Sequence, residues 1–373
     1  MSERVPAREA LPAHVRPLAD ALVDPSSATS LDLATWDVVV RVARAAQLLG
    51  TLAARLDAAG LASRCPAPVR DHLRGALLEA RFLRHAATLE IARAARVLDD
   101  AGIPFVLLKG ASYIAADLPV AAGRMLRDVD LIVPRARIDE AEALLTATGW
   151  EAETSLDAYD QHYYRSWSHQ IPPLRREGSP LELDVHHALL PVTGRMHPDA
   201  AAVMRDARSS VSGFPVPDPA DQVVHAAVHL FQDSDCTSRL RDVADVDALC
   251  RHFVRTEPRF AARLAQRAAH HGAMQPVACA LAFACGWLGT PIERTAFDDA
   301  LRASAWVVRH AQLSLPPPHP DRGRTAAERA AARRMVARAL WLRMPPSLLA
   351  YHGAMKAWRS IVPRRAGAAA APP

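Results

Sequence analysis

The chain has 373 residues, 50% of them hydrophobic and 23% charged, and a formal net charge of +5 at neutral pH. This composition is typical of a globular protein of two or three domains and excludes a long disordered chain. The N-terminus is charged and interrupted by proline, and no apolar run reaches the ~20 residues of a membrane-spanning helix. We therefore expect a cytoplasmic protein without a membrane partner.

Lysine and asparagine are nearly absent, since the chain has only Lys109 and Lys356 and no asparagine. A Walker A loop needs lysine followed by serine or threonine, and a protein kinase needs a catalytic-loop asparagine. The sequence provides neither, so both classes are excluded. The arginines are spread along the chain, and no extended nucleic-acid footprint is expected.

The cysteines form an odd set without a CxxC pair, which predicts reduced structural thiols rather than a zinc site or a disulfide framework. They are Cys65, Cys236, Cys250, Cys279 and Cys285.

A helical pattern covers residues 31–101, and Gly102 follows it as a helix-ending residue. A region of mixed pattern comes next, and the proline-rich residues 213–219 then predict a linker. The strands expected in the mixed region are 103–108, 129–133, 163–169 and 181–185, and the helices are 111–116 and 135–148. After the linker the helical pattern returns over 220–306, and a basic helix is expected over 325–343.

We predict an α+β fold with a mixed sheet between two helical regions. The predicted units are an N-terminal helical region (1–101), the mixed core (102–215), a C-terminal helical domain (216–345) and a partly disordered tail (346–373).

Two aspartates, Asp128 and Asp130, begin the apolar strand of the motif DVDLIV. Residues i and i+2 of a strand point to the same face, so the two carboxylates converge. Hard oxygen ligands of this kind suit Mg²⁺ or Mn²⁺. The same pair is also compatible with a solvated strand start or with helix capping.

A third acid, Asp184, lies in a second strand-like run, LELDVHH. A two-metal phosphoryl-transfer site needs about three carboxylates around cations ~4 Å apart. Asp128, Asp130 and Asp184 provide them, and Glu182 could replace Asp184 because it shares its face.

The motif LLKGAS places Gly110 and Ser112 after a strand and at the start of a helix, where backbone N–H groups can bind phosphate. Lys109 would add a positive charge. A simple turn would explain the same motif.

Several motifs in a fixed order resemble a known family. The set consists of LLKGAS, Arg124 four residues before DVDLIV, then LELDVHH, and finally the helical segments HAAVHLFQ and RLRDVADVDAL. It resembles the uncharacterised bacterial nucleotidyltransferases of the DNA polymerase β superfamily over roughly residues 97–249.

The resemblance implies a minimal nucleotidyltransferase fold in which Asp128 and Asp130 bind the metals and Asp184 completes the site. The residues that it assigns to the nucleotide are Lys109, Gly110 and Ser112 at the phosphates and Arg124 at the leaving pyrophosphate. The turn departs from the usual Gly-Gly or Gly-Ser of the superfamily because it is Lys-Gly here.

Two histidines within these motifs, His186 in LELDVHH and His229 in HAAVHLFQ, are further candidate site residues. His186 shares the face of Asp184 and is a candidate to position a phosphate or to orient Asp184, or a packed histidine. His229 is a further candidate near the site. With His225 and the acids Asp233, Asp242 and Asp245, it also resembles half of a metal phosphohydrolase site.

The sequence thus predicts a Mg²⁺-dependent (or Mn²⁺-dependent) enzyme that transfers a nucleoside monophosphate from an NTP to a small-molecule, peptide or RNA acceptor. One alternative is an enzyme like the nucleotidyltransferase toxins that modify tRNA. Another is a non-catalytic nucleotide-binding or scaffold protein. The basic helix, with Arg329, Arg333, Arg334 and Arg338, is compatible with an acidic partner or with a solvated surface.

Overall fold

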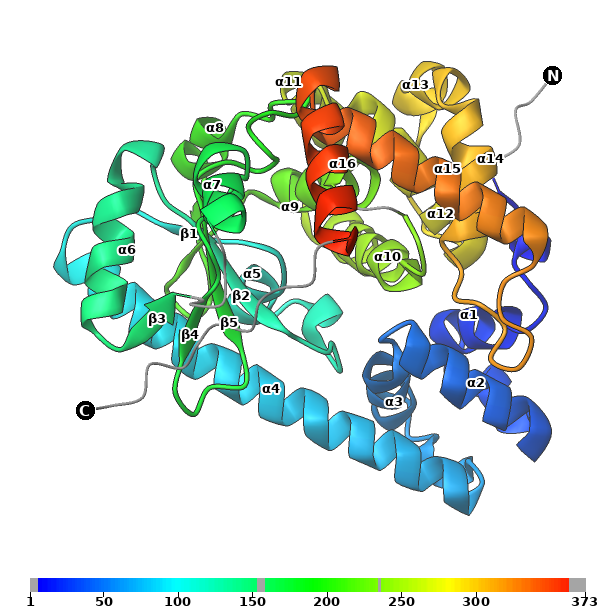
Figure 1. The fold of residues 1–373 in the computed structure, drawn as a ribbon. Coiled ribbons are helices and arrows are strands. Elements are labelled where there is room, and N and C mark those ends of the chain that lie inside the picture. Colours follow the sequence, from blue (N-terminus) through cyan, green and yellow to red (C-terminus); the bar gives the residue numbers. More distant parts are fainter. Residues whose placement is uncertain (1–5, 153–157, 234–235, 362–373) are drawn as a thin grey trace.

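A five-stranded mixed sheet lies between N-terminal and C-terminal groups of helices in the computed structural model, which describes residues 6–152, 158–233 and 236–361 (Figure 1). This arrangement confirms the predicted α+β fold. The low-complexity end of the expected tail, residues 363–373, lies outside the described residues.

The sheet has the order β1-β2-β5-β4-β3. Its strands are β1 (Val106–Leu107), β2 (Asp128–Ile132), β3 (Trp150–Ala152), β4 (Leu174–Arg176) and β5 (Glu182–His186). The central pair, β2 and β5, is parallel, and the other pairs are antiparallel. A separate two-stranded sheet consists of β6 (Arg208–Ser209) and β7 (Pro215–Val216).

The N-terminal helices are α1 (Arg16–Val23), α2 (Leu33–Ala45), α3 (Leu49–Ala58) and α4 (Ala67–Asp100). Helix α4 buries one face, on which apolar residues such as Leu73, Ala87, Ile91 and Leu98 recur at helical spacing. The helix runs from the N-terminal helices to the sheet (Figure 1) and contacts α3, α5, α6 and β2. It therefore connects the first helices to the sheet that carries the site.

The helices around the sheet are α5 (Lys109–Ala115), α6 (Ile138–Ala147), α7 (Ala158–Ser166) and α8 (Ala200–Arg205). The C-terminal helices are α9 (Pro219–Val228), α10 (Leu240–Thr256), α11 (Phe260–His270), α12 (Met274–Leu288), α13 (Asp298–Ala303), α14 (Ala305–Ser314), α15 (Ala326–Arg343) and α16 (Pro346–Ile361). A π-helical turn, η6 (His229–Asp233), extends α9. Helix α15 confirms the expected basic helix.

One hydrophobic core includes residues from all three parts of the chain, for example Trp36, Val129 and Trp287. Four of the five cysteines are buried and Cys285 is half-buried, and all five are free thiols. In the part of the chain that the structure describes, no helix is long and apolar enough to cross a membrane.

Two sequence predictions of local structure are wrong. The strand expected at 163–169 is largely helix α7, in which Tyr159 and Tyr163 are four residues apart and so lie on one helical face with Trp167 beyond it. The aromatic content favours a strand, but this spacing favours a helix. The expected linker at 213–219 instead contains β7 and the first residue of α9, Pro219.

Candidate active site

The pairing of β2 with β5 brings the predicted acidic residues together. In the parallel register Asp130 lies opposite Asp184, and Asp128 lies opposite Glu182. Alternation along β2 places Asp128 on the face of Asp130. Glu182 accepts a hydrogen bond of 2.9 Å from Arg175, so its carboxylate already has a partner.

Asp130 is buried and has two close partners. Lys109 Nζ donates a hydrogen bond of 2.7 Å to Asp130 Oδ1, and Nε2 of His186 lies 3.0 Å from the same oxygen. Burial opposes ionisation of Asp130, but Lys109 and His186 outweigh it and hold the pKa of this carboxyl well below its usual range. Burial would lower the pKa of Lys109, but Asp130 and Asp128 raise it above its usual value. The half-buried Lys109 and the buried Asp130 are therefore both charged.

The other two acids are less compensated. Repulsion from Asp130, together with burial, raises the pKa of Asp128. Burial and the charges of Asp130 and Asp128 raise the pKa of Asp184 to about 7. The cluster thus carries more negative charge than Lys109 neutralises.

A divalent cation fits this cluster. Three donor atoms lie within 4.8 Å of one another, one each from Asp130, Asp184 and His186. Oδ1 of Asp184 is buried and has no hydrogen-bond partner among the described residues. A buried carboxylate oxygen without a partner is costly, and a bound cation would compensate it.

The turn before α5 positions Lys109. Lys109 has a left-handed backbone conformation (φ 42°) directly after Leu108, whose N–H donates to the carbonyl of Asp130. Gly110 packs against Arg124, because a Cβ at Gly110 would lie 2.6 Å from Nη1 of Arg124. The glycine therefore makes room for the arginine side chain.

Ser112 is fully buried, and its hydroxyl donates to the carbonyl oxygen of Lys109 at 2.8 Å. A contact between this hydroxyl and a nucleotide would require that hydrogen bond to break. Its assignment to the phosphates stays a prediction.

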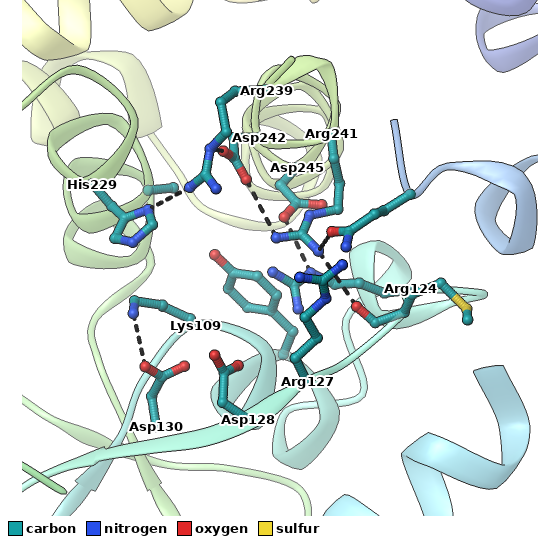
Figure 2. A pocket seen from close by; sticks show the side chains of 14 residues that line it. Lys109, Arg124, Arg127, Asp128, Asp130, His229, Arg239, Arg241, Asp242 and Asp245 are labelled. Atoms are coloured by element: carbon teal, nitrogen blue, oxygen red, sulfur yellow. Dashed lines mark hydrogen bonds and ion pairs between the residues drawn. The ribbon is translucent and has the colours of Figure 1, made fainter. Parts of the chain in front are cut away.

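A cavity of about 280 Å³ adjoins Asp128 and Asp130, is lined mostly by polar side chains, and does not have Asp184 among its lining residues. Figure 2 shows Asp128 and Asp130 on one side of it and residues of α10 on the other. Its basic wall consists of Lys109, Arg124, Arg127, Arg239 and Arg241. Such a concentration of guanidinium groups is suited to bind phosphates.

Aspartates of α10 pair with three of these arginines, and Asp242 pairs both with Arg239 and, at 3.7 Å, with Arg241. Arg124 Nε donates to Asp245 at 3.1 Å, and its guanidinium lies 5.5 Å from the centre of the Tyr113 ring. Arg239 pairs with Asp242 at 2.5 Å. These contacts orient the basic groups into the cavity.

Arg241 connects the cavity to the N-terminal helices, since its Nη1 donates to Oε1 of Gln47 at 2.5 Å. Gln47 lies between α2 and α3 with a left-handed backbone (φ 56°). The cavity wall therefore includes residues from all three parts of the chain.

The histidines predicted near the site lie close to it. Burial, with the charge of Lys109, holds the pKa of His229 well below its usual value and lowers the pKa of His225 to about 3. His229 lines the cavity, and its Nδ1 lies 3.3 Å from Arg239. The ring of His186 lies 5.0 Å from the ring of His169.

The phosphohydrolase-like alternative would need His225 and His229 to share a metal with nearby acids. Asp242 and Asp245 pair with arginines instead, and Asp130, Asp184 and His186 form the metal-sized group found among the described residues. The side chain of Asp233 lies outside them.

Sequence reasoning identified the acids, Lys109 and Arg124 but missed most of the basic wall. Arg127, Arg239 and Arg241 lie within or beside motifs quoted for the resemblance, yet an arginine-rich chain gives no local signal that singles them out. Gln47 was missed because only the tertiary fold brings it to the cavity.

The comparisons agree with this geometry. The profile of a family described as uncharacterised nucleotidyltransferase matches residues 32–289, more than half of the chain, and this segment includes every residue of the cavity wall. No curated protein and no solved structure gives a significant match. The chain therefore belongs to this family of uncharacterised nucleotidyltransferases.

Proposed function

We propose that the protein is a divalent-metal-dependent enzyme that transfers a nucleoside monophosphate from an NTP to an acceptor and releases pyrophosphate. The observation that carries this proposal is the parallel register of β2 and β5, which places Asp130 opposite Asp184 beside a basic cavity. An acidic cluster next to a basic pocket is the arrangement that a metal–triphosphate complex requires.

In this reaction Asp128, Asp130 and Asp184 would hold the cation, which neutralises charge on the phosphates. The acceptor oxygen or nitrogen forms a bond to the α-phosphorus and passes its proton to water, while the bond from the α-phosphorus to the α–β bridging oxygen breaks and pyrophosphate leaves with that oxygen. Most of the rate enhancement comes from positioning and charge stabilisation.

The basic wall is proposed to bind the β- and γ-phosphates. Arg124 and Arg239 are already oriented by aspartates, whereas the side chain of Arg127 makes no ion pair or hydrogen bond in the described part of the chain. Arg127 is thus available to a new anionic partner without breaking an existing pair.

We propose that the acceptor occupies the adjoining groove. This second cavity shares Gln47, Met125 and Arg127 with the first and continues between α2, α3 and α4 towards Arg44 and His72. A molecule lying there would reach the nucleotide past Arg127. The proposal does not specify whether the acceptor is a small molecule, a peptide or an RNA.

Label transfer tests the activity. The full chain is incubated with each α-³²P-labelled NTP, Mg²⁺ or Mn²⁺ and cell extract, and we expect label in a product of larger mass. γ-Labelled NTP should leave the product unlabelled, which separates nucleotidyl transfer from kinase activity. Treatment of the product with ribonuclease or protease then identifies the acceptor class. Equal transfer by wild type and Asp130→Asn would contradict the proposal.

A further inference from the structure

The acidic cluster contains a nitrogen donor. His186 follows Asp184 by two residues on β5, so both side chains lie on the same face of the sheet. The His186 side chain is completely buried, and its Nε2 belongs to the group of three donor atoms within 4.8 Å of one another. This nitrogen lies 3.0 Å from Oδ1 of Asp130, which is close enough for the two atoms to be neighbouring ligands of a single metal ion.

The opposite side of the His186 ring also has a suitable neighbour. The Nδ1 atoms of His186 and His169 are both buried without a hydrogen-bond partner in the described part of the chain, and the two rings adjoin. The rings form no hydrogen bond with each other as they stand, but a rotation that let one Nδ1–H donate to the other ring would satisfy both nitrogens. A metal-bound imidazole usually donates its second N–H to such a neighbour, which fixes its tautomer.

Two carboxylate oxygens and one imidazole nitrogen do not bind Mg²⁺ and Mn²⁺ equally well. Mg²⁺ is held almost entirely by oxygen and keeps much of its water, whereas Mn²⁺ also prefers oxygen but, as the first ion of the divalent transition-metal series, binds imidazole nitrogen more readily than Mg²⁺ does. We propose that His186 is a direct metal ligand beside Asp130 and Asp184, that His169 positions it, and that the site therefore selects Mn²⁺ over Mg²⁺. This inference rests on the metal-dependent site of the proposed function.

The test uses the full chain, freed of metal by a chelator and given MnCl₂ alone. We expect one tight site, with Mg²⁺ competing at least about tenfold more weakly. Pulsed electron paramagnetic resonance of the bound Mn²⁺ should show coupling to a ¹⁴N nucleus. Labelling the histidines with ¹⁵N should replace this signal by that of ¹⁵N, which tests ligation in the unaltered chain.

Variants then identify the histidine. His186→Gln should remove the nitrogen coupling and lower the ratio of Mn²⁺ to Mg²⁺ affinity about tenfold. His169→Gln should weaken Mn²⁺ binding about 10-fold to 100-fold while the coupling persists. His187→Gln is the matched control, because His187 comes directly after β5 and its Nδ1 lies 3.0 Å from Nη1 of Arg135, outside the group of donor atoms. This control should behave as wild type.

The outcomes separate this inference from the proposed function. Bound Mn²⁺ without histidine coupling would overturn the inference and leave the proposed function standing. Histidine coupling without label transfer to any acceptor would overturn the proposed function and leave the ligand assignment standing. A chain that binds no Mn²⁺ would overturn the inference, and label transfer with Mg²⁺ alone would then leave the proposed function standing.

Discussion

Asp128 and Asp130 are two residues apart on one strand, yet their surroundings differ. Asp130 accepts a hydrogen bond from Lys109 and lies next to His186, while Asp128 shows no hydrogen bond or ion pair among the described residues. From the sequence alone, the acids would be expected simply to repel one another. The structure shows that only Asp130 is compensated.

This difference predicts opposite effects of the same substitution on the metal-free fold. Asp130→Asn leaves the half-buried Lys109 charge without its carboxylate and should lower the free energy of unfolding by about 2–4 kcal/mol. Asp128→Asn removes repulsion and should leave that free energy unchanged or raise it. Urea denaturation in the presence of a chelator measures both. An equal loss in the two variants would contradict this account of Lys109.

Asp184 makes the stability of the metal-free protein depend on pH. Its pKa of about 7 in the folded chain exceeds that of an unfolded aspartate, so the fold favours its protonated form. Between about pH 4 and pH 7 the unfolded chain has released this proton and the folded chain has not, so stability falls as pH rises.

Asp184→Asn should abolish this pH dependence. The free energy of unfolding of the variant minus that of the wild type should therefore rise by roughly 3 kcal/mol between pH 4 and pH 8. Denaturation curves at four pH values in chelator measure the difference. A difference independent of pH would show that Asp184 ionises normally.

At the scale of elements, helix α3 and the loop before β2 meet at two glycines. A Cβ at Gly50 would lie 2.3 Å from the carbonyl oxygen of Gly123, which itself has a left-handed backbone (φ 70°). The loop then continues into Arg124 and Met125 of the cavity wall. The close approach of these two backbones therefore fixes the position of Arg124 and Met125 in the cavity wall.

Gly50→Ala should lower the free energy of unfolding by about 1–3 kcal/mol and should weaken nucleotide binding, because the loop must shift. Gly75→Ala on α4 is the control, since a Cβ there meets nothing within 4 Å. The control should be neutral or more stable by up to about 1 kcal/mol, with normal binding. Denaturation and titration calorimetry on both variants check the prediction.

The sequence predicted the helices and strands whose apolar residues recur at a regular spacing. It did not predict the short segments whose structure depends on tertiary contacts. The apolar spacing of α4 and the alternation around Asp128 and Asp130 were sufficient to predict one helix and one strand. The three-residue strands β3 and β4 carry too short a pattern to predict. That Asp184 pairs with Asp130 is a property of strand register, which a single strand does not encode.

At the scale of the whole molecule, the cavity is assembled from segments far apart in the chain. Gln47 comes from the N-terminal helices, Lys109 and Asp130 from the sheet region, and Arg241 from α10. Arg241 donates both to Gln47 and, at 3.4 Å, to the carbonyl oxygen of Met125. A single arginine therefore ties three parts of the wall together.

Arg241→Ala should weaken NTP binding about 10-fold to 100-fold, the scale of one charge-assisted hydrogen bond, and should also lower the melting temperature. Arg255→Ala is the control, because Arg255 is exposed on the same helix and does not line this cavity. Titration calorimetry and thermal unfolding measure both effects. Wild-type affinity in the Arg241 variant would remove this residue from the phosphate site.

The ammonium group of Lys109 donates a hydrogen bond to Asp130, which also belongs to the group of residues that could hold a metal ion. A metal ion held by Asp130 would compete with this hydrogen bond, and the ammonium would be left beside the basic cavity, where a bound phosphate would give it an anionic partner. Cation and nucleotide would then act as reciprocal effectors, each raising the affinity of the other by the same factor. Lys109, one of two lysines in an arginine-rich chain, would in this way make loading of the site cooperative between two chemically opposite ligands.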